Sequence, residues 1–297
     1  MLLSTIICTR NRADEIVNCL PVVALQARQF GDVEVVVVDN GSTDNTRAIV
    51  LELTERLEFP FKYVYEPVAG LCQARNRGRA EASGRVLAYI DDDEEIGPDW
   101  IRQIREHFLS EKSDCLAGKI GVRLEAEPPF PVDDEMLWFF CTTALGDKER
   151  YLEYPEHANG GNMSFRTEVF DAVGGFDTNL KLYGDETEFF RRVSEMEFGT
   201  YYNPKIEVNQ IIPKDRLTKE ELRHKSIVRG KGAAAVWLLG PGLGTTRLPK
   251  IVEFFLRTGY VGVRQLSGRT FGRFFTFWFN WGYLVQLTKG PNVRGGS

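Results

Sequence analysis

Short apolar segments alternate with amphipathic ones along the first 125 residues of the chain. The apolar segments are rich in Val, Ile and Leu, which favours buried strands of a parallel sheet. They predict strands at Leu2–Cys8, Val33–Val38, Phe61–Tyr65, Val86–Ile90 and Cys115–Leu124. The stretches between them repeat apolar residues at helical spacing. They predict helices at Ala13–Gln29, Asn45–Leu57, Leu71–Ser83 and Pro98–Leu109.

This alternation of strand and helix predicts an α/β fold with a doubly wound, mostly parallel sheet flanked by helices. The ligand of such a sheet binds beyond the carboxyl ends of the strands. Residues that follow directly after a strand are therefore the first candidates for a functional site.

The pattern changes at Glu125, where an acidic, Pro-rich stretch begins. Residues 132–165 have no clean period, and helices are predicted again at Thr167–Val173 and Asp185–Met196. We expect a catalytic domain over residues 1–235, made of a nucleotide-binding half (1–125) and an acceptor half (126–235). Residues 236–297 form a basic, aromatic-rich helical appendage in this interpretation.

Two apolar helical patterns occupy residues 247–289 of this appendage. In the second, Phe271, Phe274, Phe275, Trp278, Trp281, Leu284 and Val285 recur at about helical spacing. The uncharged stretch between Arg273 and Lys289 is short for a transmembrane span. The pattern favours a helix lying in the headgroup region of a membrane. A helical hairpin packed on the catalytic domain or on another subunit is the alternative.

Charge is unevenly distributed along the chain. Between Arg223 and Arg294 there are twelve Lys or Arg and one acid, Glu253, a balance of +11. Because the whole chain carries −5, residues 1–222 carry −16. This asymmetry indicates either an anionic partner for the C-terminal part, such as a membrane surface, or a basic face that neutralises the acidic body.

Cysteine and histidine usage excludes some classes of site. The five cysteines are widely spaced without a CxxC pair, which is typical of a reducing compartment. No secretory signal is visible at the start, so we expect a cytoplasmic protein. The three histidines are far apart in sequence, which argues against a histidine zinc site.

Acidic residues follow predicted strands or begin a predicted helix at three places: Asp39, Asp91-Asp92-Asp93 and Asp185-Glu186. Three adjacent carboxylates repel one another, and Mg²⁺ or Mn²⁺ bound together with substrate phosphates would offset that repulsion. If the strand remained extended, Asp91 and Asp93 would point the same way, one towards a ribose and one towards the metal. A solvated turn is the alternative for this triplet.

Asp39 and Arg75 are weaker signals by themselves. Asp39 can accept hydrogen bonds from a base or a ribose, but Asn40-Gly41 after it also predicts an ordinary turn. Arg75 follows Gly70 at a helix start, where a phosphate can bind, or it belongs to a solvated basic face.

Taken together, these segments resemble the family 2 glycosyltransferases, which have the GT-A fold. The resemblance covers residues 2–235. It is carried by Ser4 to Arg12, Val38 to Asp44, Gly70-Leu71 with Ala74-Arg75-Asn76, Tyr89 to Asp93, Gly160 to Arg166, Gly174 to Asp177, and Gly184 to Glu188.

The resemblance implies transfer of a sugar from a nucleoside diphosphate with inversion at the anomeric carbon. It implies that Thr9 and Asp39 contact the base, Asp91 the ribose, and Asp93 a divalent metal, Mn²⁺ or Mg²⁺. Arg10 and Arg75 belong to the same nucleotide site. Asp185-Glu186 matches the family's acidic pair, whose second member is the general base. Many relatives carry a metal-binding His near residues 206–211, where this chain places Asn209.

The sequence thus predicts a glycosyltransferase of polysaccharide or glycolipid assembly. Its donor would be a nucleoside diphosphate sugar, most often a UDP-sugar in this family. Its acceptor would be lipid-linked or a glycan, with peripheral contact to the inner face of the cell membrane and no nucleic-acid partner. A sugar nucleotidyltransferase is less favoured, because Thr9-Arg10-Asn11-Arg12 lacks a phosphate-loop glycine. A nucleotide-sugar-binding module that has lost catalysis is a further alternative.

Overall fold

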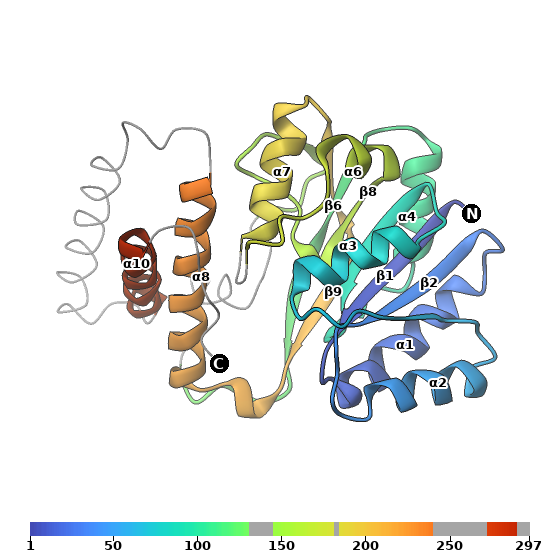
Figure 1. Ribbon diagram of the computed structural model, residues 1–297, viewed down its shortest axis with the longest axis horizontal. Helices are drawn as coiled ribbons and strands as arrows, with labels where there is room; N and C mark the ends of the chain where they lie inside the picture. The colour runs from blue at the N-terminus through green and yellow to red at the C-terminus, as the bar shows by residue number, and fades with distance from the viewer. Residues whose placement is uncertain (131–144, 181–183, 240–271, 290–297) are drawn as a thin grey trace. The chain divides into compact units, whose positions relative to one another are not determined.

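The computed structural model describes residues 1–130, 145–180, 184–239 and 272–289 (Figure 1). The predicted alternation is present at the N-terminus. The elements there are β1 (Leu3–Thr9), α1 (Ala13–Ala27), β2 (Val33–Asp39), α2 (Thr46–Arg56), β3 (Lys62–Tyr65), α3 (Leu71–Glu81), β4 (Val86–Asp91), β5 (Glu94–Ile96), α4 (Trp100–Leu109) and β6 (Cys115–Leu124).

The later elements are shorter or less regular in sequence. They are β7 (Arg150–Leu152), the 3₁₀ turn η1 (Gly160–Asn162), β8 (Met163–Arg166), α6 (Thr167–Val173), α7 (Asp185–Glu195), β9 (Thr200–Ile212), the 3₁₀ turn η2 (Lys214–Arg216), α8 (Lys219–Leu239) and α10 (Gly272–Lys289). Of the predicted helices, α6 has the predicted bounds and α7 ends one residue early.

Within the described residues the strands form one mixed sheet in the order β3-β2-β1-β4-β8-β6-β9-β5, with β7 on β9. The first four strands of this order are parallel, and β4–β8, β6–β8 and β5–β9 are antiparallel pairs. The predicted fold class, a mostly parallel α/β sheet flanked by helices, is confirmed.

Alternate residues of the parallel strands face two different helix layers. On one face, side chains such as Ile7, Val37 and Ala88 pack in a core with α1, α2 and α4. On the other face, Ile6 and Val38 lie against Gly78 of α3. Figure 1 shows α3 on the side of β1 and β2 opposite α1 and α2. Because both faces are covered, most residues of the central strands β1, β2 and β4 are apolar, as their sequence indicates.

An aromatic cluster extends the second layer towards the later elements. Tyr89 of β4 stacks on Phe165 of β8, with ring centroids 5.6 Å apart, and Phe165 in turn contacts Phe189 of α7 at 5.1 Å. Phe176 lies against both Tyr89 and Phe189. These contacts fix α7 beside β4, which is the strand that carries the aspartate triplet.

The described chain divides into two compact units. Unit 1 is Met1–Gly121, Thr143–Thr178 and Glu186–Ile211, and unit 2 is Val122–Thr142, Asn179–Asp185 and Ile212–Ser297. In unit 2, helix α10 packs on α8, and Gly282 of α10 lies directly against the backbone of Ile227. The predicted domain limits at residues 125 and 235 stay predictions.

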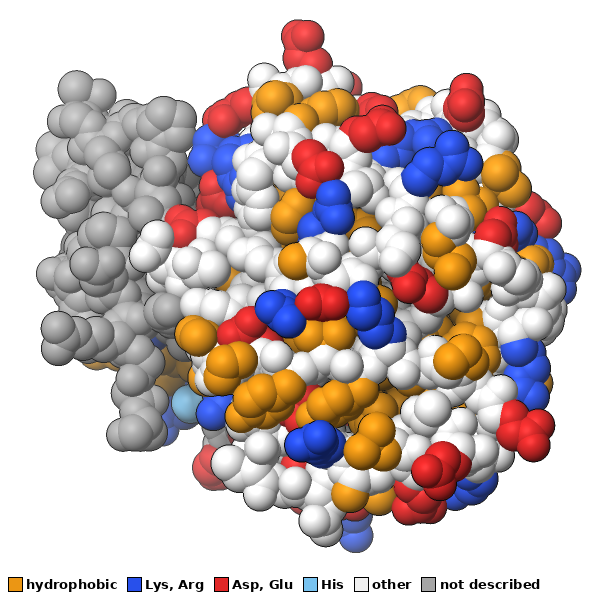
Figure 2. Space-filling model, turned by 45° about the vertical axis from the view of Figure 1, so that its right-hand side comes forward, with side chains coloured by type: hydrophobic (Ala, Val, Ile, Leu, Met, Phe, Trp, Pro, Cys, Tyr) orange, Lys and Arg blue, Asp and Glu red, His pale blue; other side chains and the backbone are white. Residues whose placement is uncertain are grey.

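The second apolar pattern of the C-terminal part is a helix, α10, as expected. The first pattern, together with Phe271 and Cys141, lies outside the described residues. Among the described residues, no helix combines the length and the apolar character that crossing a bilayer requires. On the face drawn in Figure 2, acidic and basic side chains are interspersed with apolar ones.

Candidate functional site

Three parallel strands end at the same level, and each ends in a candidate residue. Thr9 of β1 is in register with Asp39 of β2, and Cys8 is in register with Asp91 of β4. Thr9 and Asp39 are buried, with 3% and 1% of their surface exposed. The edge of the sheet therefore gathers three of the residues that the sequence predicted for the nucleotide.

Asp39 is held by its own turn and by a neighbouring strand. The Ser42 N–H donates to Asp39 Oδ1 at 2.8 Å, and the Tyr63 hydroxyl donates to Oδ2 at 2.6 Å. Burial, followed by this hydrogen bond to Asp39, raises the Tyr63 pKa. The turn that Asn40-Gly41 predicted is thus present. It orients the Asp39 carboxylate, so the turn and a binding role for Asp39 are compatible. Tyr63 was not identified from the sequence.

The aspartate triplet does not stay extended. Strand β4 ends at Asp91, residues 92 and 93 form a turn, and β5 begins at Glu94. The condition under which Asp91 and Asp93 would project as alternate residues of one strand is therefore not met. The turn is stabilised by the ladder with β9, in which the Ile211 N–H donates to the Asp93 carbonyl.

Of the two arginines that follow β1, Arg12 is the one that contacts this turn. Arg12 Nη1 donates to Asp93 Oδ2 at 2.8 Å and lies 3.5 Å from Asp92 Oδ1. Arg10, two residues earlier, is exposed in the bend after β1. The sequence analysis selected Arg10 and missed Arg12, although both follow the first strand.

The pKa values of the Asp91 and Asp92 carboxyls are raised. Burial raises the pKa of Asp92 to about 7, with Asp93 adding to the rise and Arg12 opposing it. Surrounding protein also raises the pKa of Asp91, and Asp93 and Glu186 add to it while Arg75 opposes it. Water still reaches 43% of the Asp91 side chain, which weakens this effect. Burial thus disfavours the ionised form of both carboxyls, and a bound cation would offset that cost.

Arg75 joins the strand edge to helix α7. Its side chain is only 3% exposed, with Nη1 3.2 Å from Glu186 Oε1 and Nη2 3.8 Å from Asp91 Oδ1. The Tyr89 hydroxyl donates to the Arg75 carbonyl at 3.0 Å, and the guanidinium lies 5.5 Å from the centre of the Phe176 ring. Arg75 is thus a buried site residue, and the solvated-face alternative is wrong.

The acidic pair at the start of α7 divides between a buried and an accessible residue. Asp185 is 2% exposed, while 20% of the Glu186 side chain is accessible. Glu186 Oε1 also accepts a hydrogen bond from the Gly160 N–H at 3.1 Å. Of the two, Glu186 is the one whose carboxylate reaches both solvent and the other site residues.

Two glycines of η1 leave room for these side chains. A methyl group on Gly160 would overlap Arg75 Nη2 and Glu186 Oε1, and one on Gly161 would overlap the Glu94 carboxylate. Glu94, 4% exposed, accepts a hydrogen bond from the Asp91 N–H at 3.2 Å. The close approach of three charged side chains requires glycine at both positions. Glu94 is a further residue that the sequence analysis missed.

Metal ligands from the chain are few. The described residues contain no group of three or more His, Cys, Asp or Glu side chains placed to hold a metal ion. Asp93 and its neighbours offer hard carboxylate oxygens, which fit Mg²⁺ or Mn²⁺ when phosphates and water complete the shell. The residues present therefore fit a metal shared with a phosphate ligand better than a metal held by protein alone.

The structure corrects the position expected for Asn209. In the β5–β9 ladder Glu94 is opposite Gln210, so their side chains share one face, and Asn209 lies on the other face beside Gly121. Gln210 is 8% exposed, and its Oε1 has no hydrogen-bond partner in the described part of the chain. The residue of this strand on the site's face is Gln210.

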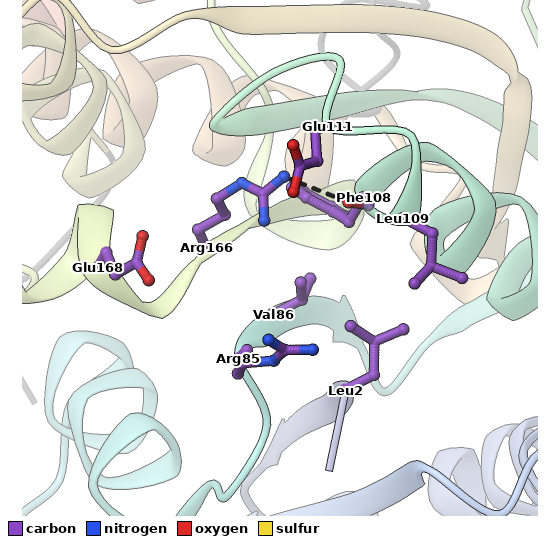
Figure 3. Close-up of a pocket in the computed structure, with 8 residues that line it drawn as sticks. All are labelled: Leu2, Arg85, Val86, Phe108, Leu109, Glu111, Arg166 and Glu168. Atoms are coloured by element: carbon purple, nitrogen blue, oxygen red, sulfur yellow. Dashed lines mark hydrogen bonds between the residues drawn. The ribbon is translucent and has the colours of Figure 1, made fainter.

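A cavity of about 120 Å³ lies at the opposite end of the strands (Figure 3). Leu2 and Val86, at the beginnings of β1 and β4, form part of its wall together with Arg85 and Arg166. Because Thr9 and Asp91 are the last residues of the same strands, this cavity is separate from the carboxylate site.

Comparison with known proteins agrees with this geometry. The family model described as glycosyl transferase family 2 matches residues 4–174, more than half of the chain. The chain belongs to glycosyltransferase family 2. The match extends from β1 through the aspartate triplet to η1 and α6, so it includes most of the candidate site.

Three named relatives illustrate the range of proteins to which the chain is similar. Glycosyltransferase AglE of Haloferax volcanii is 25% identical over 80% of this chain and 74% of its own length. Succinoglycan biosynthesis protein ExoM of Rhizobium meliloti is 29% identical over 71% of this chain and 67% of its own length. A third, glucosyl-dolichyl phosphate glucuronosyltransferase of H. volcanii, is 26% identical, and the chain spans 59% of its length.

Solved structures share the fold. The mannosyltransferase PcManGT from Pyrobaculum calidifontis, in complex with GDP-Man and Mn²⁺, is 17% identical with a TM-score of 0.65. That match covers 96% of this chain and 86% of the other. S. aureus TarS 1-349 in complex with UDP-GlcNAc is 15% identical with a TM-score of 0.57, covering 97% and 91%. The chain is therefore a glycosyltransferase of family 2 that transfers a sugar from a nucleotide sugar, on a GT-A fold.

Proposed function

We propose that this enzyme transfers a sugar from a UDP-sugar to a hydroxyl acceptor with inversion, in polysaccharide or glycolipid assembly. The observation that carries the proposal is Arg75, whose buried guanidinium lies between Asp91 and Glu186. One side of this arrangement suits a ribose, and the other suits an acceptor hydroxyl. An enzyme of this type must bind the donor's ribose and the acceptor hydroxyl no farther apart than about the length of one sugar.

The donor's nucleoside is assigned to the ends of β1 and β2. Thr9, Arg10 and Asp39 surround the base in this proposal, and Asp91 accepts hydrogen bonds from the ribose hydroxyls. The fixed orientation of Asp39 supports the assignment, because a carboxylate already held by Ser42 and Tyr63 does not need to be ordered when the ligand binds.

Glu186 is proposed as the general base. Its carboxylate takes the proton of the acceptor hydroxyl as that oxygen attacks the anomeric carbon, and the bond to the diphosphate oxygen breaks on the opposite face. Arg75 and the Gly160 N–H hold Glu186 Oε1, which orients the second oxygen for the proton. Asp185 is buried and is proposed to fix the start of α7.

Asp93 is proposed to hold a divalent metal, Mn²⁺ or Mg²⁺. Such a metal, when bound, supplies positive charge to the diphosphate leaving group. The metal bound by PcManGT supports the proposal only at the level of the fold.

The acceptor is proposed to be lipid-linked or a growing glycan. The relative that acts on glucosyl-dolichyl phosphate and the relative from succinoglycan biosynthesis support these two classes. We further propose peripheral contact of the basic C-terminal part with an anionic membrane, at the cytoplasmic face. Trp281 of α10, 47% exposed, supports this contact.

A ligand panel tests the proposed donor. UDP, GDP and dTDP are added to the enzyme with and without Mn²⁺, and the melting temperature is measured, since a ligand that binds the native state stabilises it. We expect the largest rise with UDP and Mn²⁺ together, and we expect UDP-sugar turnover with Mn²⁺. A larger rise with GDP would overturn the UDP assignment, and no turnover of any nucleotide sugar would overturn the catalytic one.

A further inference from the structure

Arg12 occupies the place where the site has its greatest excess of negative charge. Its Nη1 atom is 2.8 Å from Asp93 Oδ2, 3.5 Å from Asp92 Oδ1 and 3.7 Å from Glu15 Oε1. The side chains of Asp92 and Asp93 are only 9% and 11% exposed, so water screens their mutual repulsion poorly.

The backbone that carries Arg12 is fixed, whereas its side chain can move. The Arg12 N–H donates to Thr46 Oγ1, and the Thr43 N–H donates to the Asn11 side chain, which ties the loop to the start of α2. The Arg12 side chain is 28% exposed and extends from this loop to the triplet. A change of rotamer can therefore remove the guanidinium from Asp93 without unfolding the loop.

Arg12 and a divalent cation compete for Asp93. Arg12 already donates to Asp93 Oδ2, and a cation bound at that oxygen would lie close to the guanidinium, where two positive charges repel one another. The chain supplies too few ligands to outweigh this repulsion by itself, since the described residues contain no three-ligand metal group. A nucleoside diphosphate changes the balance, because its phosphates provide metal ligands and also attract a guanidinium.

We infer that Arg12 is a built-in counter-ion that competes with the divalent cation for Asp92 and Asp93 until a diphosphate draws it away. The inference rests on the proposed metal role of Asp93 and adds a positioning residue to it. Cation and diphosphate then bind cooperatively, and each raises the affinity for the other by the same factor. Because Arg12 competes for these carboxylates, the divalent cation binds weakly when no nucleotide-sugar donor is present.

The test measures Mn²⁺ binding by the full-length enzyme without nucleotide, from the electron paramagnetic resonance signal of free Mn²⁺. We expect Arg12→Gln to tighten Mn²⁺ binding by about fivefold or more, the scale of one lost charge-assisted contact. Arg12→Lys keeps the charge and should stay close to the wild type. Arg56→Gln, in the last turn of α2, removes one charge elsewhere and should leave Mn²⁺ affinity unchanged.

A second measurement gives the coupling between the two ligands. The ratio of Mn²⁺ dissociation constants without and with UDP should be smaller in Arg12→Gln than in the wild type. Melting curves of each variant show whether the fold is retained, and Arg12→Lys serves as the folded reference if Arg12→Gln is unstable. If Arg12→Lys binds Mn²⁺ several-fold more weakly or more tightly than the wild type, that result also contradicts a role of Arg12 that depends on its charge.

The outcomes separate the two levels of the proposal. If the wild type binds Mn²⁺ with UDP, and Arg12→Gln binds Mn²⁺ alone no more tightly than the wild type, the counter-ion role is overturned and the metal role of Asp93 stands. If Mn²⁺ binds neither protein with or without UDP, or if Asp93→Asn binds it as the wild type does, the metal assignment fails and the counter-ion role fails with it.

Discussion

Glu186 Oε1 accepts hydrogen bonds from two donors, the Arg75 guanidinium and the Gly160 backbone amide. Both donors favour the ionised carboxylate, which is the form that a general base requires. Glutamine has nearly the same shape and can still accept a hydrogen bond from Gly160, but it cannot take a proton. This makes Glu186→Gln a clean test of the assigned base.

We expect Glu186→Gln to leave donor binding nearly normal and to lower transfer by roughly 10²-fold or more, the scale of lost general-base catalysis. Calorimetric titration with donor and single-turnover transfer rates measure the two effects separately. Asp185→Asn is the control variant. If Asp185→Asn is inactive while Glu186→Gln transfers normally, the roles of the two residues are reversed.

Asp92 should make stability depend on pH in an unusual direction. Burial first, and then Asp93, raise its pKa from 3.8 to about 7, against the effect of Arg12. Between these two values the folded state binds more protons than the unfolded state, so the free energy of unfolding falls as pH rises. We expect Asp92→Asn to be more stable than the wild type at pH 8, by on the order of 1 kcal/mol or more.

Urea denaturation between pH 5 and pH 8 measures this difference. The gap between Asp92→Asn and the wild type should narrow steadily as pH falls to 5, because the wild-type carboxyl is then protonated in the folded state. A gap of equal size at every pH would show that the pKa of Asp92 is not raised.

At the residue level the sequence identified candidate site residues better than it identified the side chains that contact them. Asp39 and Asp91 end strands and Glu186 lies in the first turn of α7, so their places could be inferred from element boundaries, whereas Arg75 lies in the second turn of α3. Arg12 and Tyr63 are brought to the site by contacts between segments distant in sequence, whereas Glu94 directly follows the aspartate triplet and could have been inferred from it. A one-dimensional pattern contains no signal for such pairings, apart from the presence of Arg12 in the loop after the first strand.

The turn η1 shows how one short element supports several charged groups. It is anchored by Asn162, whose Nδ2 donates to the carbonyls of Lys119 and Ile206 and whose Oδ1 accepts from Trp100 Nε1 at 2.9 Å. Because the turn is held in place at Asn162, the backbone at Gly160 cannot move away to make room for a side chain. Arg75 and Glu186 fill the space that such a side chain would need.

We therefore expect Gly160→Ala to lower the transfer rate by about tenfold or more, because the added methyl separates Arg75 from Glu186. Gly31→Ala is the matched control, since a methyl there meets nothing within 4 Å. Steady-state kinetics and melting curves are measured for both variants. Equal activity of Gly160→Ala and Gly31→Ala would show that the Arg75–Glu186 contact is not needed for catalysis.

Strand β9 shows why the second half was harder to predict than the first. From Lys205 onwards its residues alternate, with Ile206, Val208 and Gln210 buried and Lys205, Glu207 and Asn209 less so. This period of two is a strand signal, but Pro204 and the charges interrupt it. The sequence alone did not show which of Asn209 and Gln210 faces the site, because a shift of one residue along a strand exchanges its two faces.

At the scale of the whole molecule, helix α10 combines buried polar and exposed aromatic residues. Asn280 and Gln286 are buried, with 6% and 1% exposed, while Trp281 is 47% exposed. An exposed Trp in the basic C-terminal part of the chain suits the headgroup region of an anionic membrane, where each Lys or Arg adds about 1 kcal/mol of attraction.

We expect the full-length enzyme to sediment with anionic vesicles at low salt, and less with neutral vesicles or at high salt. Trp281→Glu should reduce this binding without lowering the melting temperature, because the side chain is already exposed. Leu51→Glu on α2, where 46% of the leucine is exposed, is the matched control and should bind as the wild type does. Equal sedimentation of all three proteins would rule out contact through α10.

The two compact units have a consequence for any attempt to shorten the protein. The polypeptide passes from one unit to the other after residues 121, 142, 178, 185 and 211, so each unit is assembled from three separate stretches. A single protease cut between residues 122 and 211 therefore divides both units, and a stop codon before residue 212 truncates both. A minimal catalytic fragment must keep the chain continuous through residue 211, and its acidic pair is divided by one of the crossings, between Asp185 and Glu186.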